Sequence, residues 1–139
     1  MDTVLVARDL GPSLALNQIA NGLGGVQECF FGNGKELSRP VSEIFEEAKR
    51  TGVILCGMSS SPDLAKEELA ACETAVKNGV PLALFADTFR AWGRPWFEPY
   101  REAASALFVV SPAEAEKARE LFLSQVYSRG GATETGDYR

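Results

Sequence analysis

Small hydroxyl side chains and acids follow several short apolar runs in this sequence. The run at residues 53–56 is followed by GMSSS at 57–61, Asp9 follows the run at 3–7, and Asp87 ends the run at 80–86. Hydroxyls both donate and accept hydrogen bonds, whereas carboxylates accept them and can act as general bases. If these runs are neighbouring strands, their polar ends can form one site for a polar small molecule.

Glycines beside these residues leave room for a ligand and for sharp backbone turns. The serines also have a structural interpretation, since serine before Pro62-Asp63 is common N-capping chemistry. Asp9 and Asp87 can equally cap a helix or a turn. The candidate ligand-binding residues are Asp9, Gly11, Ser13, Gly57, Ser59, Ser60, Ser61 and Asp87.

Two further features have competing interpretations. Glu67 and Glu68 fall in the first turns of an expected helix, where acids interact favourably with the helix dipole, and we expect them to be solvated. The segment at 89–97 is rich in aromatic residues, and it can cover the sheet edge, form a protein interface or stack on a ligand. Its lid or interface residues are Phe89, Trp92, Trp96 and Phe97.

The absence of histidine excludes several kinds of chemistry. The sequence contains no histidine, so Ser-His-Asp and Cys-His mechanisms and imidazole-bound zinc are ruled out. We expect no metal site, and no cofactor, because both the dinucleotide fingerprint and the phosphate-loop motif are missing after the first apolar run. Cys29, Cys56 and Cys72 are odd in number and widely spaced, which favours reduced core thiols.

Composition and charge indicate an ordinary soluble domain. The chain has 139 residues, 45% of them hydrophobic and 24% charged. Its net charge of -5 argues against a nucleic-acid partner, which requires a clustered basic face. No apolar run approaches the roughly 20 residues of a membrane span, and no basic segment precedes the first run. We therefore expect a cytoplasmic protein without membrane contact.

Hydrophobic periodicity predicts alternating strands and helices. Gly11-Pro12 is interpreted as a turn, residues 87–100 as a loop with a short helix, and Ser111 as the N-cap of the last helix. The domain is expected to span 1–127, followed by a disordered tail at 128–139. Strands are predicted at 3–7, 26–31, 53–56, 80–86 and 105–110, and helices at 13–21, 42–50, 62–77 and 111–123.

This alternation is typical of an α/β fold with parallel strands joined by right-handed crossovers. We predict a three-layer α/β/α, Rossmann-like domain with a five-stranded parallel sheet. The expected strand order is 2-1-3-4-5, and the alternative is 3-2-1-4-5. Under the first order, residues 8–13 face residues 57–61 across one crevice, at the carboxyl ends of the strands where such folds bind ligands.

These strand ends resemble the N-terminal, acceptor-side domain of GT-B-type glycosyltransferase-like proteins. The likeness extends over about residues 3–124. It departs from the family pattern at Leu10, where a proline is expected, and at Met58, where a threonine is expected. The matching positions are Arg8, Asp9, Gly11, Gly57, Ser59, Glu67, Gly79, Val80, Pro81, Asp87, Trp92 and Phe97.

In that family a separate C-terminal domain binds the nucleotide-sugar donor. The present sequence ends near the first domain, so the resemblance implies a second glycosyltransferase chain as partner, or a binding module without its own catalysis.

Three functional hypotheses follow. The first is a domain that binds a polar small molecule, namely a sugar, nucleotide or anion, and is non-catalytic alone or dependent on a partner. The second is a homodimeric interaction module that uses residues 89–97. The third is an enzyme with Asp9 or Asp87 as its base, for which the sequence identifies no reaction.

Overall fold

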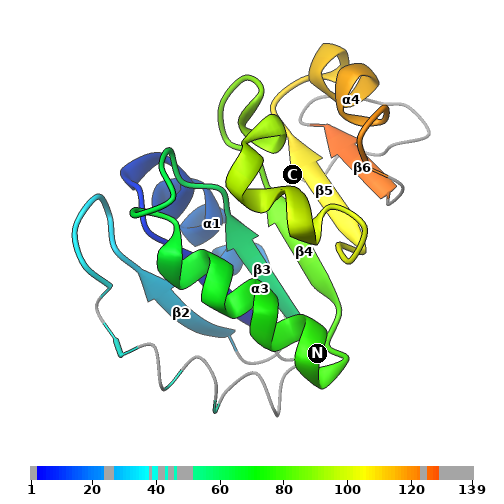
Figure 1. Ribbon diagram of the computed structural model, residues 1–139. Helices are drawn as coiled ribbons and strands as arrows, with labels where there is room; N and C mark the ends of the chain where they lie inside the picture. Colours follow the sequence, from blue (N-terminus) through cyan, green and yellow to red (C-terminus); the bar gives the residue numbers. More distant parts are fainter. Residues whose placement is uncertain are drawn as a thin grey trace.

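The computed structural model describes residues 3–23, 27–37, 39–40, 43, 46, 52–122 and 125–128. Strands and helices alternate along the chain (Figure 1). In chain order, the elements are β1 (Thr3–Ala7), α1 (Leu10–Gly22), β2 (Gln27–Phe31), β3 (Val53–Gly57), α3 (Lys66–Asn78), β4 (Leu82–Phe85), the 3-10 helices η1 (Ala91–Gly93) and η2 (Pro95–Tyr100), β5 (Ala106–Val109), α4 (Pro112–Ala118) and β6 (Gln125–Ser128).

The strands form one sheet in which all pairs are parallel. Their order is β2-β1-β3-β4-β5-β6, which confirms the predicted α/β class and the order 2-1-3-4-5 of the first five strands. The alternative order 3-2-1-4-5 is wrong, because β1 pairs directly with β3 and Leu5 lies opposite Leu55. The carboxyl ends of β1, β3 and β4 therefore lie next to one another.

The sixth strand, β6, was not predicted. It pairs with β5 from Gln125 opposite Ala106 to Ser128 opposite Val109. Four residues give too short an alternation to indicate a strand, and the predicted helix at 111–123 extended almost to it. The helix α4 instead ends at Ala118. Ser128, the first residue of the predicted tail, is buried in β6, and residues 129–139 lie outside the described residues.

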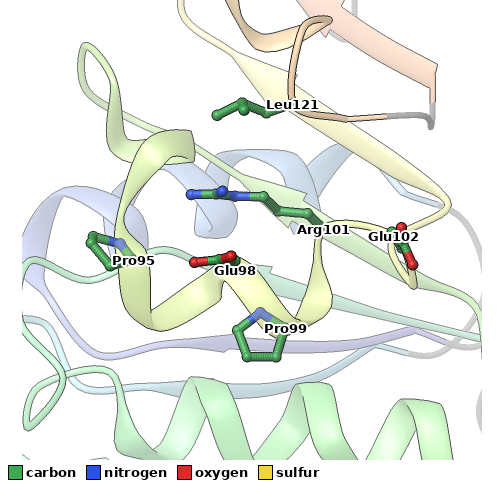
Figure 2. A pocket seen from close by; sticks show the side chains of 6 residues that line it. All are labelled: Pro95, Glu98, Pro99, Arg101, Glu102 and Leu121. Atoms are coloured by element: carbon green, nitrogen blue, oxygen red, sulfur yellow. The ribbon is translucent and has the colours of Figure 1, made fainter.

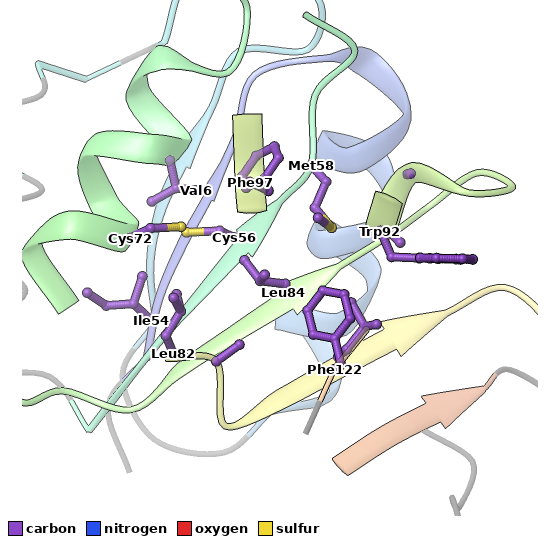
Figure 3. Close-up of a cluster of buried hydrophobic side chains, with 14 of the residues drawn as sticks. Val6, Ile54, Cys56, Met58, Cys72, Leu82, Leu84, Trp92, Phe97 and Phe122 are labelled. Carbon is purple, nitrogen blue, oxygen red and sulfur yellow. The ribbon is translucent and has the colours of Figure 1, made fainter. Parts of the chain in front are cut away.

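Side chains alternate between the two faces of the sheet, as the period of a strand requires. On β1, Val4 and Val6 belong to one buried cluster, whereas Leu5 and Ala7 belong to another. The first cluster includes residues of α3, the 3-10 helices and α4, and part of it is drawn in Figure 3. The second includes Leu16 and Ala20 of α1. Helices thus cover both faces, which confirms the three-layer architecture.

The start of α1 differs from the prediction. Gly11 and Pro12 were interpreted as a turn, but α1 begins at Leu10 and includes both. Proline is tolerated there, since its missing amide hydrogen would have no partner in the first helical turn. Asp9 occupies the N-cap position, yet its side chain makes no capping hydrogen bond.

The remaining helices follow the sequence signals more closely. Gly79 ends α3 in the left-handed conformation, with φ of 65°. Ser111 caps α4 as predicted, because its hydroxyl accepts a hydrogen bond from the Glu114 amide at 3.3 Å. In the predicted helix at 42–50, Glu43 and Glu46 are helical and the other residues lie outside the described part of the chain.

Candidate functional site

Polar residues from three strand ends meet between β1 and β3. In the sheet order, β1 and β3 lie side by side, while the chain runs outward from them in opposite directions to β2 and β4. This is the point at which parallel α/β sheets leave a crevice for ligands. Residues 8–13, 58–61 and 86–87 lie at this point.

Asp9 and Ser60 join the ends of β1 and β3. The Asp9 Oδ2 atom accepts hydrogen bonds from the Ser60 amide at 2.9 Å and from the Ser60 hydroxyl at 2.8 Å, and Ser60 is exposed. The structure thus brings the ends of β1 and β3 together across 51 residues of sequence. In the described structure, the Asp9 carboxylate binds the loop after β3 instead of capping α1.

The other serines of the candidate site serve the fold. Ser61 Oγ accepts a hydrogen bond from the Leu64 amide at 3.1 Å, which is the capping interaction that the sequence offered as the structural interpretation of these serines. Ser13 is fully buried, where it donates to the Ala7 carbonyl and accepts from the Asn33 amide, both at 3.1 Å. Ser59 is also fully buried. Of these hydroxyl groups, the one of Ser60 remains at the exposed edge.

The two glycines permit close approach between segments. A β carbon on Gly57 would lie 2.6 Å from Pro12 Cβ and 3.2 Å from Ala7 Cβ, so α1 packs directly on the end of β3. A β carbon on Gly11 would collide with Asp87 Oδ2. Close packing explains both glycines, whereas the sharp turn expected at Gly57 does not occur because it is the last residue of β3.

Asp87 lies partly buried over the first turn of α1. Burial raises the pKa of its carboxyl group, its own backbone amide and Arg94 lower it, and the negative charge of Asp9 raises it. Among the described residues, no side chain donates a hydrogen bond to this carboxylate. Asp9, Gly11, Ser60 and Asp87 are from here on called the strand-end site.

The segment after Asp87 holds the neighbouring loop in place. The guanidinium group of Arg94 donates to the Met58 carbonyl, and the Trp96 indole donates to the Ser59 carbonyl at 3.1 Å. Trp92 is buried and its indole donates to Glu114 of α4 at 3.0 Å.

The aromatic side chains of this segment have different environments. Phe97 is fully buried in the core cluster, where an aromatic side chain contributes about 1.5–3 kcal/mol of stability. Trp92 and Phe97 therefore support the lid interpretation. Phe89 is 75% exposed and is available for contact with another molecule.

Glu68 is the principal residue of this region that is missing from the candidate ligand-binding residues. We expected it to be solvated, but it is fully buried and its carboxylate accepts hydrogen bonds from the Ser59 amide at 2.8 Å, the Ser59 hydroxyl at 2.9 Å and the Arg8 amide at 3.1 Å. Burial raises its pKa to about 8, against the effect of these hydrogen bonds, and Asp9 raises it as well.

A signal for Glu68 was present in the sequence. Its position continues the spacing of three and four residues shared by Ala65, Cys72 and Ala75, all of which are buried. The resemblance to the glycosyltransferase-like domains matched the neighbouring residue, Glu67, which is also buried. Its Oε1 atom lies 4.0 Å from the guanidinium group of Arg8.

A separate pocket lies on η2, away from the strand-end site. It has a volume of about 550 Å³ and its walls carry charges of both signs (Figure 2). It shares no residue with the strand-end site. Its lining residues are Pro95, Glu98, Pro99, Arg101, Glu102 and Leu121.

Within the described residues, no group of three or more histidine, cysteine, aspartate or glutamate side chains can hold a metal ion. Over the same residues, every helix is too short or too polar to cross a bilayer. No family model matches the chain, and no curated protein is significantly similar to it. Function must therefore be inferred from the site itself.

Proposed function

We propose that this domain binds a small molecule rich in hydroxyl groups, of the sugar or nucleoside class, at the strand-end site. The observation that carries the proposal is the carboxylate of Asp87. It lies against Gly11 at the start of α1, and no side chain of the described residues donates to it. A partly buried acceptor with free lone pairs is suited to a hydroxyl donor.

The charges of the site favour hydroxyl groups over an anion. Asp9 and Asp87 lie close enough for the charge of Asp9 to raise the pKa of Asp87. Two carboxylates near the start of α1 repel a phosphate or carboxylate ligand there, and the single positive charge of Arg94, which lowers the pKa of Asp87, does not balance both. The resemblance to acceptor-side glycosyltransferase domains adds sugars to the ligands worth testing, with a second glycosyltransferase chain as a possible partner.

A binding screen tests the proposal. D-glucose, uridine and their monophosphates are titrated into the wild-type protein, Asp87→Asn and the control Asp63→Asn, which lies in an exposed turn. A hydrogen bond to a charged group contributes about 1.5–3 kcal/mol, so Asp87→Asn is expected to weaken binding about 10- to 100-fold. The control should bind like wild type.

The monophosphates separate the ligand classes. The proposal requires the neutral compounds to bind more tightly than their monophosphates. Tighter binding of the monophosphates would support the anion hypothesis in its place. Equal binding by wild type and Asp87→Asn would contradict the proposed site.

Exposure of Phe89 supports a second candidate function, a homodimer formed through this side chain. Trp92 and Phe97 are buried, so their substitution would unfold the chain and not test an interface. Sedimentation of the wild type, Phe89→Ala and the control Val76→Ala, another exposed apolar position, makes the test. The dimer hypothesis requires a concentration-dependent dimer that only Phe89→Ala dissociates.

The proposal includes a cytoplasmic location. The three cysteines are free thiols, which is the state expected in a reducing compartment. The raised pKa of Asp87 also suits a general base.

A further inference from the structure

The carboxylate of Glu68 joins the ends of β1 and β3 beneath the strand-end site. Its Oε2 atom accepts from the Arg8 amide at 3.1 Å and from the Ser59 hydroxyl at 2.9 Å, and its Oε1 atom accepts from the Ser59 amide at 2.8 Å. Glu68 itself comes from the first turn of α3. One side chain thus fixes the loops that follow β1 and β3.

Ser59 connects this carboxylate to Asp9. The Ser59 hydroxyl oxygen accepts a hydrogen bond from the Asp9 amide at 3.0 Å while its proton is directed to Glu68. The next residue, Ser60, donates twice to the Asp9 carboxylate. Glu68, Ser59, Asp9 and Ser60 therefore form one continuous chain of hydrogen bonds, here called the Glu68 network.

Protonation of Glu68 changes the donors in this network. The ionised carboxylate only accepts, which satisfies all three of its donors. A proton on Oε2 has the Ser59 hydroxyl oxygen as its nearest acceptor, so the bond between the two groups reverses. The Ser59 proton then loses its partner, and because Glu68 and Ser59 are fully buried, water cannot replace it.

We propose that Glu68 is a positioning residue of the strand-end site, and that ionisation of its carboxyl group fixes Asp9 and Ser60 in the arrangement that binds ligand. This inference rests on the proposed function, since it describes the regulation of the same site. The hydrogen-bond pattern in the structure corresponds to the ionised form. Ligand affinity is expected to rise as Glu68 loses its proton.

The groups around Glu68 determine the pH range in which its carboxyl group loses its proton. Burial raises its pKa to about 8, and the charge of Asp9, at the end of β1, raises it as well. On β3, the Cys56 thiol donates to the backbone carbonyl of Glu68 at 3.7 Å. The Arg8 guanidinium group faces Glu67 and the Lys35 carbonyl. The change is thus expected between about pH 7 and 9.

Amide NMR spectra of the free protein, recorded from pH 6 to about 9.5, test the network independently of any ligand. We expect the amides of Arg8, Asp9, Ser59 and Ser60 to share an inflection near pH 8. Glu68→Gln should abolish it, whereas Glu73→Gln should preserve it. Glu73 lies on the same helix, is exposed and pairs with Lys77 at 3.4 Å.

Ser59→Ala separates positioning from a general role in folding. This variant removes the hydroxyl link to Asp9 but keeps both amide bonds to Glu68. The inflection should keep its size at the backbone amides of Arg8 and of the substituted position, and become clearly smaller at Asp9 and Ser60. An inflection of unchanged size at Asp9 and Ser60 in this variant, or a shared inflection in Glu68→Gln, would overturn the inference. So would its absence from the wild type.

Binding of D-glucose and uridine at pH 7 and 9 completes the test. Affinity should rise at least threefold between these values in the wild type and Glu73→Gln, and stay constant in Glu68→Gln. This fold-change corresponds to about 0.6 kcal/mol. Binding of either compound without the shared inflection would contradict the role of Glu68 but not the proposed function. A shared inflection without binding of either compound would contradict the proposed function but not the hydrogen-bond network.

Discussion

The carboxylate of Asp87 lies so close to the backbone of Gly11 that a β carbon at position 11 would collide with Asp87 Oδ2. Gly11 belongs to the first turn of α1, whereas Asp87 follows β4, on the far side of β3 in the sheet. The contact brings an acidic side chain to the start of α1, beside the carboxyl ends of β1 and β3. Any larger residue at position 11 would displace it.

Gly11→Ala is therefore expected to move the Asp87 carboxylate at little cost to stability. The colliding atom ends a side chain that can rotate, and alanine favours the helix over glycine by roughly 0.5–1 kcal/mol. The free energy of unfolding in urea should change by less than about 1 kcal/mol, while the Asp87 amide resonance shifts. Gly22→Ala, at the open end of α1, should leave that resonance unchanged. An unmoved Asp87 resonance in Gly11→Ala would contradict the described contact.

Gly57→Ala should be considerably more destabilising. Its new methyl group would meet Pro12 Cβ at 2.6 Å and Ala7 Cβ at 3.2 Å, and neither atom can move without shifting backbone. Overpacking of this kind costs about 1–3 kcal/mol. Urea unfolding measures this loss of stability relative to Gly93→Ala, because a β carbon at position 93 would have no atom within 4 Å. Similar losses in the two variants would show that α1 does not pack on β3 as described.

The buried Glu68 makes stability depend on pH. Its pKa in the folded protein is about 8, above its ordinary value of 4.5, so the folded state holds the proton more tightly than the unfolded state. The stabilisation of the folded state that this difference in pKa provides is fully present below pH 4.5 and is lost as the pH rises to about 8. The unfolding free energy of the wild type, relative to Glu68→Gln, should fall by several kcal/mol between pH 5 and 9.

Urea unfolding of both proteins at pH 5, 7 and 9 provides this comparison, because the difference cancels the other titrating groups. Glu68→Gln should also be less stable than the wild type at pH 5, since an amide nitrogen replaces an oxygen that accepts from the Arg8 or Ser59 amide. A constant difference across the pH range would exclude the raised pKa.

The cysteines should differ in reactivity. Cys56 and Cys72 are fully buried with their sulfur atoms facing each other (Figure 3). The interaction with the Cys72 thiol, together with burial, raises the pKa of Cys56. Cys29 is only partly buried. Iodoacetamide should label Cys29 of the native protein at least about 10-fold faster than the other two, as peptide mass spectrometry would show. Equal rates would contradict the packing of α3 on β3.

The sheet was predictable from sequence because its inner strands are continuous apolar runs. The runs ending at Ala7, Cys56 and Ala86 indicated buried strands, and their alternation with helices favoured parallel pairing. The strand β6 was not predictable on the same basis. Its four residues pair along the open edge of β5, so tertiary pairing and not local pattern defines it.

The proximity of the strand ends was predictable, but their internal hydrogen-bond partners were not. The predicted strand order placed Asp9 beside Ser59 and Ser60, and the structure joins these residues by hydrogen bonds. The sequence could not distinguish a serine that serves the fold from one at the surface, because both types follow a strand. The burial of Glu68 was also not predicted, although its helical spacing indicated it, since an acid in a first helical turn usually interacts with the dipole in solvent.

The measurement that most directly tests the proposed site is an amide NMR titration of the wild type and Asp87→Asn with D-glucose and uridine. The account predicts that one of these compounds shifts the amides of Gly11, Ser60 and Asp87, and that Asp87→Asn needs about 10- to 100-fold more of the compound for the same shifts. Shifts confined to the pocket at Arg101 and Leu121, or no shifts with either compound, would contradict it.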